Sequence, residues 1–240
     1  SCESAIVFLH GWGSNKEVMK SSFAPYLKDF KHIYIDMPGF GKSENQYVLT
    51  TTDYANIVNE FLKKILICDE KKVMNENNKE KKPSLITNHS SPYTIVGHSF
   101  GGKVATLLNP KNLILLSSAG IIEEKASKVK FKLAFVKVLK SIGIGSLTKV
   151  LRSKDVNHMS EAMYGTFKNV VNEDFEENFK LYKNNALIFW GKEDSATSFE
   201  SGKKISTLIE NSKFYSYNGD HYFFMKNAND ITTKITNGIL

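Results

Sequence analysis

Arginine and cysteine are scarce in this sequence of 240 residues, and each scarcity excludes a class of protein. Arg152 is the single arginine, whereas arginine is the preferred residue for bidentate contacts to phosphates and to guanine. A sequence-specific nucleic-acid binder is therefore not expected, although the net charge is +7. The two cysteines, Cys2 and Cys68, are too few for a disulfide framework and lack metal-ligand spacing. This cysteine content fits a reducing, cytoplasmic setting best.

Long apolar stretches are also missing from the sequence. No continuous run reaches the roughly 18 apolar residues that a membrane-spanning helix requires. The apolar fraction of 41% is nevertheless sufficient for a buried core, and the length suits a single domain over residues 1–240. Apolar residues instead gather in six short runs, typical of strands that helices cover on both faces. These runs are Ala5–Leu9, His32–Asp36, Tyr93–Val96, Leu113–Leu116, Ala186–Trp190 and Lys213–Tyr217.

Helical patterns lie between most of these runs. Residues 53–67 place apolar side chains at a period of about 3.6 residues, and residues 103–108 continue from a glycine-rich turn. Thr197 and Glu200 have the spacing of a capping box that opens a further helix. The alternation of strand and helix predicts an α/β fold with a mostly parallel central sheet and helices on both faces.

Two segments interrupt this alternation. Residues 69–91 are polar and rich in Lys, Asn and Glu, which indicates an exposed insertion between a helix and the next strand. Residues 121–183 separate two strand candidates by far more chain than a crossover needs, and they contain amphipathic helical patterns. We interpret this second segment as a helical cap over the ends of the strands.

Residues 97–101, Gly-His-Ser-Phe-Gly, form a G-x-S-x-G pentapeptide between a strand candidate and a helix candidate. A sharp strand-to-helix turn forces its central residue, Ser99, into strained backbone angles and exposes the hydroxyl at the carboxyl end of the sheet. The flanking glycines let neighbouring chain approach closely, and the following helix directs free N–H groups toward the reaction centre. Ser99 is therefore the candidate nucleophile.

A serine hydroxyl needs a base, and His221 is the best candidate because it follows the last strand candidate. A third residue should accept a hydrogen bond from the imidazole and fix its tautomer. Asp194 follows the strand candidate at 186–190 and completes the chain order Ser, Asp, His. Glu193 beside it and the more remote Glu123 are alternatives for the acid.

The oxyanion formed during acyl transfer needs preorganised donors. One candidate is the N–H of Phe100, next to the nucleophile, and the second is the N–H of Trp12 in the loop after the first strand candidate. Residues 41–43, Gly-Lys-Ser, imitate the end of a phosphate-binding loop, but Asp36 stands where that motif requires glycine. Nucleotide binding is therefore rejected.

Together these motifs resemble the α/β-hydrolase superfamily. Four signatures occur in the family's order: His-Gly-Trp-Gly at 10–13, Asp-x-Pro-Gly-x-Gly-x-Ser at 36–43, Gly-His-Ser-Phe-Gly-Gly at 97–102, and the pair Asp194 and His221. The resemblance implies an α/β-hydrolase fold whose helical cap follows the equivalent of the family's sixth strand. It also implies a serine hydrolase, since the similar epoxide hydrolases and haloalkane dehalogenases carry Asp at the nucleophile position.

A closer likeness is to the pimeloyl-carrier-protein methyl ester esterases of biotin biosynthesis, which carry a similar stretch at 10–18 and a similar turn at 36–43. It implies hydrolysis of a methyl ester on an acyl chain held by an acidic carrier protein. Residues 125–154 contain eight lysines and Arg152 but no acid, so they could dock such a carrier or simply form a solvated face. The lysines expected to dock it are Lys125, Lys128, Lys130, Lys132, Lys137 and Lys140.

The sequence therefore predicts a carboxylester hydrolase that needs no metal or cofactor. Ser99 attacks the ester carbonyl, His221 transfers the proton, and Asp194 orients the imidazole ring. Water then hydrolyses the acyl-enzyme. A carbon–carbon hydrolase and a cofactor-free haloperoxidase-like enzyme would use the same residues. A non-catalytic binding module on the same fold is the alternative from a different class.

Overall fold

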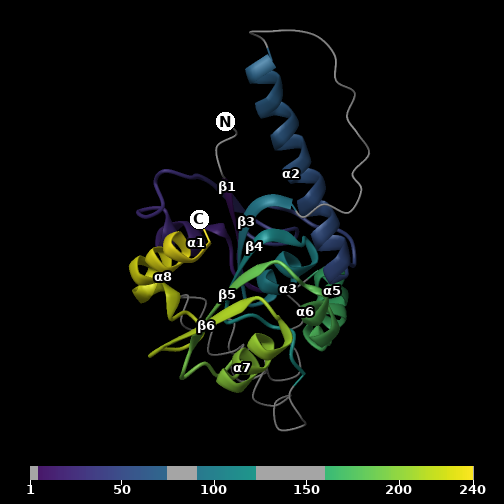
Figure 1. The fold of residues 1–240 in the computed structure, drawn as a ribbon. Helices are drawn as coiled ribbons and strands as arrows, with labels where there is room; N and C mark the ends of the chain where they lie inside the picture. The colour runs from purple at the N-terminus through teal and green to yellow at the C-terminus, as the bar shows by residue number, and fades with distance from the viewer. Residues whose placement is uncertain (1–4, 75–90, 123–159, 240) are drawn as a thin grey trace.

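The computed structural model describes residues 5–74, 91–122 and 160–239. In this part of the chain a six-stranded sheet has the order β2-β1-β3-β4-β5-β6, and every neighbouring pair is parallel (Figure 1). The strands are β1 Ala5–Leu9, β2 Lys31–Ile35, β3 Ser91–His98, β4 Pro110–Leu116, β5 Asn185–Gly191 and β6 Ser212–Tyr217. All six strands predicted from apolar runs are confirmed, with small shifts at their ends.

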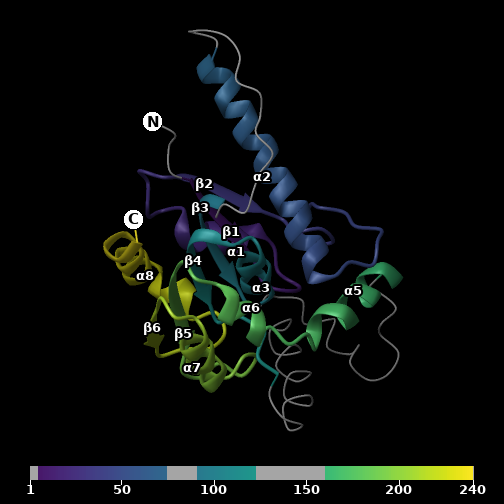
Figure 2. The same ribbon diagram turned by 45° about the vertical axis from the view of Figure 1, so that its right-hand side comes forward.

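Helices connect these strands and cover both faces of the sheet (Figures 1 and 2). They are α1 Lys16–Phe23, α2 Thr51–Met74, α3 Phe100–Leu107, α5 Glu161–Val171, α6 Glu176–Leu181, α7 Phe199–Leu208 and α8 Phe224–Ile239. Helices α1 and α8 pack together on one face, and α2, α3, α6 and α7 lie on the other. The predicted α/β fold class is therefore confirmed. Among the described helices, none has the length and apolar character that crossing a bilayer requires.

The continuous apolar runs follow from this layered arrangement. Successive side chains of a strand point to opposite faces of the sheet. In β1, Val7 and Leu9 belong to the core beneath α2 and α3, whereas Ile6 and Phe8 belong to the core beneath α1 and α8. A strand covered on both sides must therefore be apolar at almost every position.

The two predicted insertions lie mainly outside the described residues. Residues 69–74 continue α2 and do not open a loop, because Glu, Lys and Met are good helix formers that extend it to Met74. Ser91 already begins β3. Of the predicted cap, residues 123–159 lie outside the described residues, and so do the lysines expected to dock a carrier. The described remainder of that segment carries α5 and α6.

Helix α5 is held against the loop that precedes α2. The N–H of Leu49 donates to the hydroxyl of Thr166 at 2.9 Å, and the side-chain amide of Asn169 donates to the carbonyl of Leu49 at 3.2 Å. These bonds join α5 to a segment more than a hundred residues earlier in the chain. They fix the face of α5 that turns toward the carboxyl ends of the strands.

A buried charge holds the other end of α5. Lys103 of α3 is 1% exposed, and its Nζ donates to Glu173 at 2.7 Å and to the carbonyl of Val170 at 2.8 Å. The ammonium also lies 4.7 Å from the centre of the Phe175 ring. Thr51, the first residue of α2, donates its hydroxyl to the same Glu173 oxygen. Lys103 and its partner Glu173 together therefore connect α2, α3 and α5.

We expect the two partners of this ion pair to differ in their importance for stability. Removing the carboxylate by Glu173→Ala leaves a buried ammonium unpaired and should lower the free energy of unfolding by about 3 kcal/mol. Lys103→Met should cost less, because Glu173 is 31% exposed and can be hydrated. Urea unfolding of the two variants measures this difference. A larger loss in the Lys103 variant would contradict it.

Candidate active site

The turn between β3 and α3 holds Ser99 in a backbone conformation that L-residues rarely adopt. Its φ is 52° and its ψ is −117°. The N–H of Ser99 donates to the carbonyl of Leu116 at 3.1 Å, and its own carbonyl accepts from the N–H groups of Gly102 at 3.0 Å and Ala119 at 3.1 Å. Because the surrounding chain supplies all three bonds, the strained conformation is maintained.

The two glycines of the pentapeptide stand where backbone segments touch. A Cβ at Gly97 would lie 2.5 Å from the carbonyl oxygen of Gly101. A Cβ at Gly101 would lie 2.5 Å from the oxygen of Leu9 and 2.6 Å from that of His10. These neighbours are backbone atoms and cannot rotate away. The close approach expected from the glycine spacing is confirmed, and it brings the loop after β1 beside Ser99.

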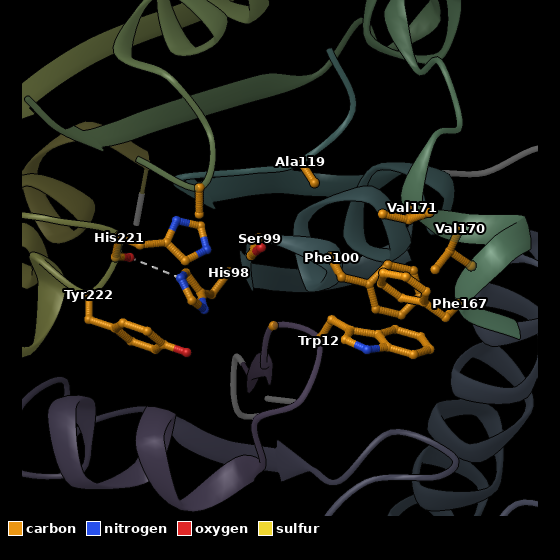
Figure 3. Close-up of a pocket in the computed structure, with 12 residues that line it drawn as sticks. Trp12, His98, Ser99, Phe100, Ala119, Phe167, Val170, Val171, His221 and Tyr222 are labelled. Carbon is orange, nitrogen blue, oxygen red and sulfur yellow. Dashed lines mark hydrogen bonds between the residues drawn. The ribbon is translucent and has the colours of Figure 1, made fainter. Parts of the chain in front are cut away.

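His221 and Asp194 meet although 27 residues separate them in the chain. Nδ1 of His221 lies 2.8 Å from Oδ2 of Asp194, and both side chains are buried. A carboxylate accepts, so Nδ1 carries the proton and Nε2 is left as the acceptor. In Figure 3 the His221 ring turns its free edge toward Ser99. The structure thus brings the three predicted residues together at one edge of the sheet.

Asp194 is suited to remain ionised in this position. Burial alone would raise the pKa of its carboxyl group, but His221 and the N–H of Thr197 outweigh that effect and lower the pKa below its ordinary value of 3.8. Glu193, the neighbouring alternative, instead accepts a hydrogen bond from the N–H of Gly219. Asp194 is therefore the acid in contact with the imidazole. Glu123, the remote alternative, lies outside the described residues.

Thr197 is not the N-cap of α7, which its spacing to Glu200 predicted, but a hydrogen-bond partner of Asp194. The predicted capping box at Thr197 and Glu200 is wrong, because Ser198 is the N-cap of α7 and accepts from the N–H of Ser201 at 3.2 Å. Thr197 contacts Asp194 instead, with its N–H at 3.0 Å from Oδ1 and its hydroxyl at 2.9 Å from Oδ2. The capping box was a plausible signal, and no sequence pattern marked this residue as a partner of the acid.

The two predicted oxyanion donors come from adjacent elements. Phe100 is the first residue of α3, so its N–H has no carbonyl partner within that helix. Trp12 lies in the loop after β1, and its ring packs edge-on against Phe100 with centroids 5.6 Å apart. Gly11 lies directly against Ser99, since a Cβ at Gly11 would lie 3.1 Å from Cβ of Ser99. Both donor residues border the same pocket as Ser99.

The pocket in front of Ser99 is largely apolar (Figure 3). Trp12, Phe100 and Phe167 form its aromatic side, and α5 contributes Phe167 together with Val170 and Val171. Among the described residues that line it, none is Asp, Glu, Lys or Arg. Such a lining suits an uncharged, apolar group of a ligand next to the serine. Within the described residues, no cluster of His, Cys, Asp and Glu is arranged to hold a metal ion.

A second histidine, His98, forms the back wall of the site. Its ring lies 4.6 Å from that of His221, and its Nε2 donates to the backbone carbonyl of His221 at 3.0 Å. Burial, reinforced by the charge of His221, lowers the pKa of His98 well below its ordinary value of 6.5. His98 is therefore a neutral packing residue and is not available as the base.

The amino-acid sequence is similar to those of known hydrolases. The model of the Alpha/beta hydrolase family matches residues 6–173. Over 53 residues the chain is 40% identical to a pimeloyl-[acyl-carrier protein] methyl ester esterase of Pectobacterium carotovorum. That match spans 22% of this chain and 21% of the esterase, so the likeness to this relative is confined to about a fifth of its length.

Solved structures share the whole fold at low sequence identity. An esterase from Exiguobacterium antarcticum is 19% identical, with a TM-score of 0.70 over 98% of this chain and 91% of that one. A lipase-esterase related protein from Clostridium acetobutylicum is 20% identical, with a TM-score of 0.69 over 98% of this chain and 94% of that one. At such identities the similarity concerns the fold alone.

Two glycine-to-alanine substitutions should change stability in opposite directions. Alanine favours a helix by about 1 kcal/mol over glycine, and both Gly101 in α3 and Gly238 in α8 are helical. A Cβ at Gly238 meets only the methyl groups of Leu187, at 3.3 and 3.5 Å, whereas one at Gly101 meets backbone oxygen at 2.5 Å. We expect Gly238→Ala to be neutral or stabilising and Gly101→Ala to lose about 2 kcal/mol in urea unfolding. Equal stability of the two variants would refute the close approach.

Proposed function

The chain belongs to the alpha/beta hydrolase family, and on this basis we propose that it cleaves carboxylic esters through an acyl-enzyme on Ser99. The main support is the buried contact of 2.8 Å between Nδ1 of His221 and Oδ2 of Asp194. The other edge of the His221 ring faces Ser99. A buried acid–imidazole pair of this kind is what a weak hydroxyl nucleophile needs. A binding module would have no use for it.

The proposed reaction follows from the position of each group. The hydroxyl of Ser99 attacks the ester carbonyl while Nε2 of His221 takes its proton, and Asp194 stabilises the imidazolium that forms. The N–H groups of Phe100 and Trp12 hold the developing oxyanion. His221 then gives the proton to the leaving alcohol. Water attacks the acyl-enzyme in the second half of the reaction, again with His221 as the base.

The substrate is proposed from the pocket and from the local sequence likeness. The apolar lining by Trp12, Phe167 and Val170 suits a methylene chain or a small alkyl ester. The short stretch of 40% identity is shared with an esterase that acts on a methyl ester of a carrier-bound acyl chain. We therefore propose a methyl ester on an acidic carrier protein as the substrate, with the lysines at 125–140 as its docking surface.

Reaction with a fluorophosphonate probe tests the nucleophile directly. The folded protein should be labelled on Ser99, which peptide mass spectrometry can locate. Ser99→Ala should abolish labelling, and Asp194→Asn should slow it by about 10³- to 10⁴-fold because an amide that donates to Nδ1 leaves the imidazole in the wrong tautomer. A folded wild-type protein without label on Ser99 would overturn the proposed function.

A panel of esters at several salt concentrations tests the substrate. We expect turnover of short p-nitrophenyl esters to be nearly independent of salt. Turnover of a methyl ester on an acyl carrier protein should fall steeply as salt screens the attraction. Charge reversal at Lys128 and Lys132 should raise KM for the carrier-bound ester only. A salt-insensitive rate on that substrate would refute carrier docking and leave the esterase activity intact.

A further inference from the structure

We infer that Thr197 is a positioning residue that holds the acid of the site in place and keeps it ionised beside His221. This inference rests on the proposed function, because it assigns a task within the same acid–base pair. Thr197 does not line the pocket, and it acts on the reaction through Asp194 and His221, since its hydroxyl lies 2.9 Å from Oδ2 and 3.4 Å from Nδ1. Its task is therefore separable from substrate binding.

Four donors surround the two oxygens of the Asp194 carboxylate. Oδ1 accepts from the N–H groups of Ala196 at 2.8 Å and Thr197 at 3.0 Å. Oδ2 accepts from Nδ1 of His221 at 2.8 Å and from the hydroxyl of Thr197 at 2.9 Å. Thr197 is thus the only one of these residues that contacts both oxygens, and it shares Oδ2 with the imidazole.

The hydroxyl of Thr197 has one proton and two acceptors within reach, and the protonated Nδ1 of His221 lies 3.4 Å from its oxygen. Oδ2 of Asp194 lies at 2.9 Å, and the carbonyl of Ser117 lies at 3.2 Å. The bond to the ionised carboxylate is the stronger one, since one partner carries a charge. By donating to Oδ2, the hydroxyl favours the ionised carboxylate and makes that oxygen less basic. The proton between Asp194 and His221 therefore stays on the imidazole.

Thr197 itself is fixed by the ends of two strands. Its carbonyl accepts from the indole N–H of Trp190, the buried residue next to the end of β5, at 3.1 Å. Its hydroxyl touches the carbonyl of Ser117, the residue that follows β4. Ser117 has a φ of 45°, and its N–H donates to Phe189 of β5 at 2.9 Å. The loop between β5 and α7, which carries Asp194, is thus attached to the strands of the sheet through Thr197.

The other titratable groups around the imidazole do not change charge at moderate pH. His98, from the end of β3, lies 4.6 Å from the His221 ring, and burial lowers its pKa well below 6.5. Tyr222 lies 5.6 Å away, and burial raises its pKa to about 12. A shift in pH dependence near neutral pH would therefore report on the pair of Asp194 and His221.

Two substitutions separate the hydroxyl of Thr197 from its methyl group. Thr197→Val keeps the shape and removes the donor, whereas Thr197→Ser keeps the donor and removes the methyl. We expect Thr197→Val to lower kcat about tenfold with KM unchanged, because the Asp194 carboxylate is no longer held in line with Nδ1 of His221. The acidic midpoint of kcat/KM should move to higher pH, because the more basic Oδ2 holds the imidazolium proton more strongly. Thr197→Ser should behave as wild type.

A second readout does not depend on activity. Nuclear magnetic resonance of the His221 ring should show its titration at higher pH in Thr197→Val than in wild type and Thr197→Ser. Unchanged titration and kcat in Thr197→Val would overturn the inference, and so would equal defects in both variants, which would indicate packing by the methyl group. Should Thr197→Val fail to fold, Thr197→Cys replaces the hydroxyl by a weaker donor of similar size. Absence of fluorophosphonate labelling in wild type would instead reject the proposed function.

Discussion

The N-terminus of α3 packs against the end of β1 without room for one methyl group. The backbone of Gly101 touches the carbonyls of Leu9 and His10, and the backbone of Gly97 touches Gly101 in turn. Ser99, which stands between these two glycines, has a positive φ that hydrogen bonds to Leu116, Gly102 and Ala119 maintain. The contact of Gly101 with Leu9 and His10 also brings the loop that carries Trp12 beside Ser99. Serine and candidate oxyanion donors are therefore products of one steric constraint between two backbone segments.

The parallel pairing of the strands places Asp194 and His221 close to Ser99. The carboxyl ends of β1, β3, β5 and β6 lie at the same edge of the sheet, so each following loop can contribute one part of the site. Two buried charges stabilise the arrangement. Asp194 is held by backbone N–H groups, Thr197 and His221, whereas Lys103 binds Glu173 behind the nucleophile turn. Through α5, Lys103 also fixes the apolar wall of the pocket.

Local signals and long-range contacts account for what sequence reasoning found and missed. The six strands were predictable because a strand buried on both faces is apolar at nearly every position. Ser99 was predictable because only glycine permits its neighbours to approach so closely. The sequence does not separate Asp194 from Glu193, since adjacent acids differ only in where the turn after β5 directs them. It indicates a helix cap at Thr197, because a hydroxyl near a helix start also fits a cap.

The sequence by itself determined the order of the strands along the chain, the tight turn at Ser99 and the histidine after the last strand. These depend on residue type and on spacing within a few positions, where sterics and periodicity act locally. Only the tertiary structure decided which acid meets His221, that Thr197 supports it, and that Lys103 connects three helices. The buried hydrogen bonds of these residues reach across 27 positions from His221 to Asp194, 67 from Lys103 to Val170 and 80 from Thr197 to Ser117. Which residues meet depends on the order of the strands in the sheet, because this order decides which loops lie side by side.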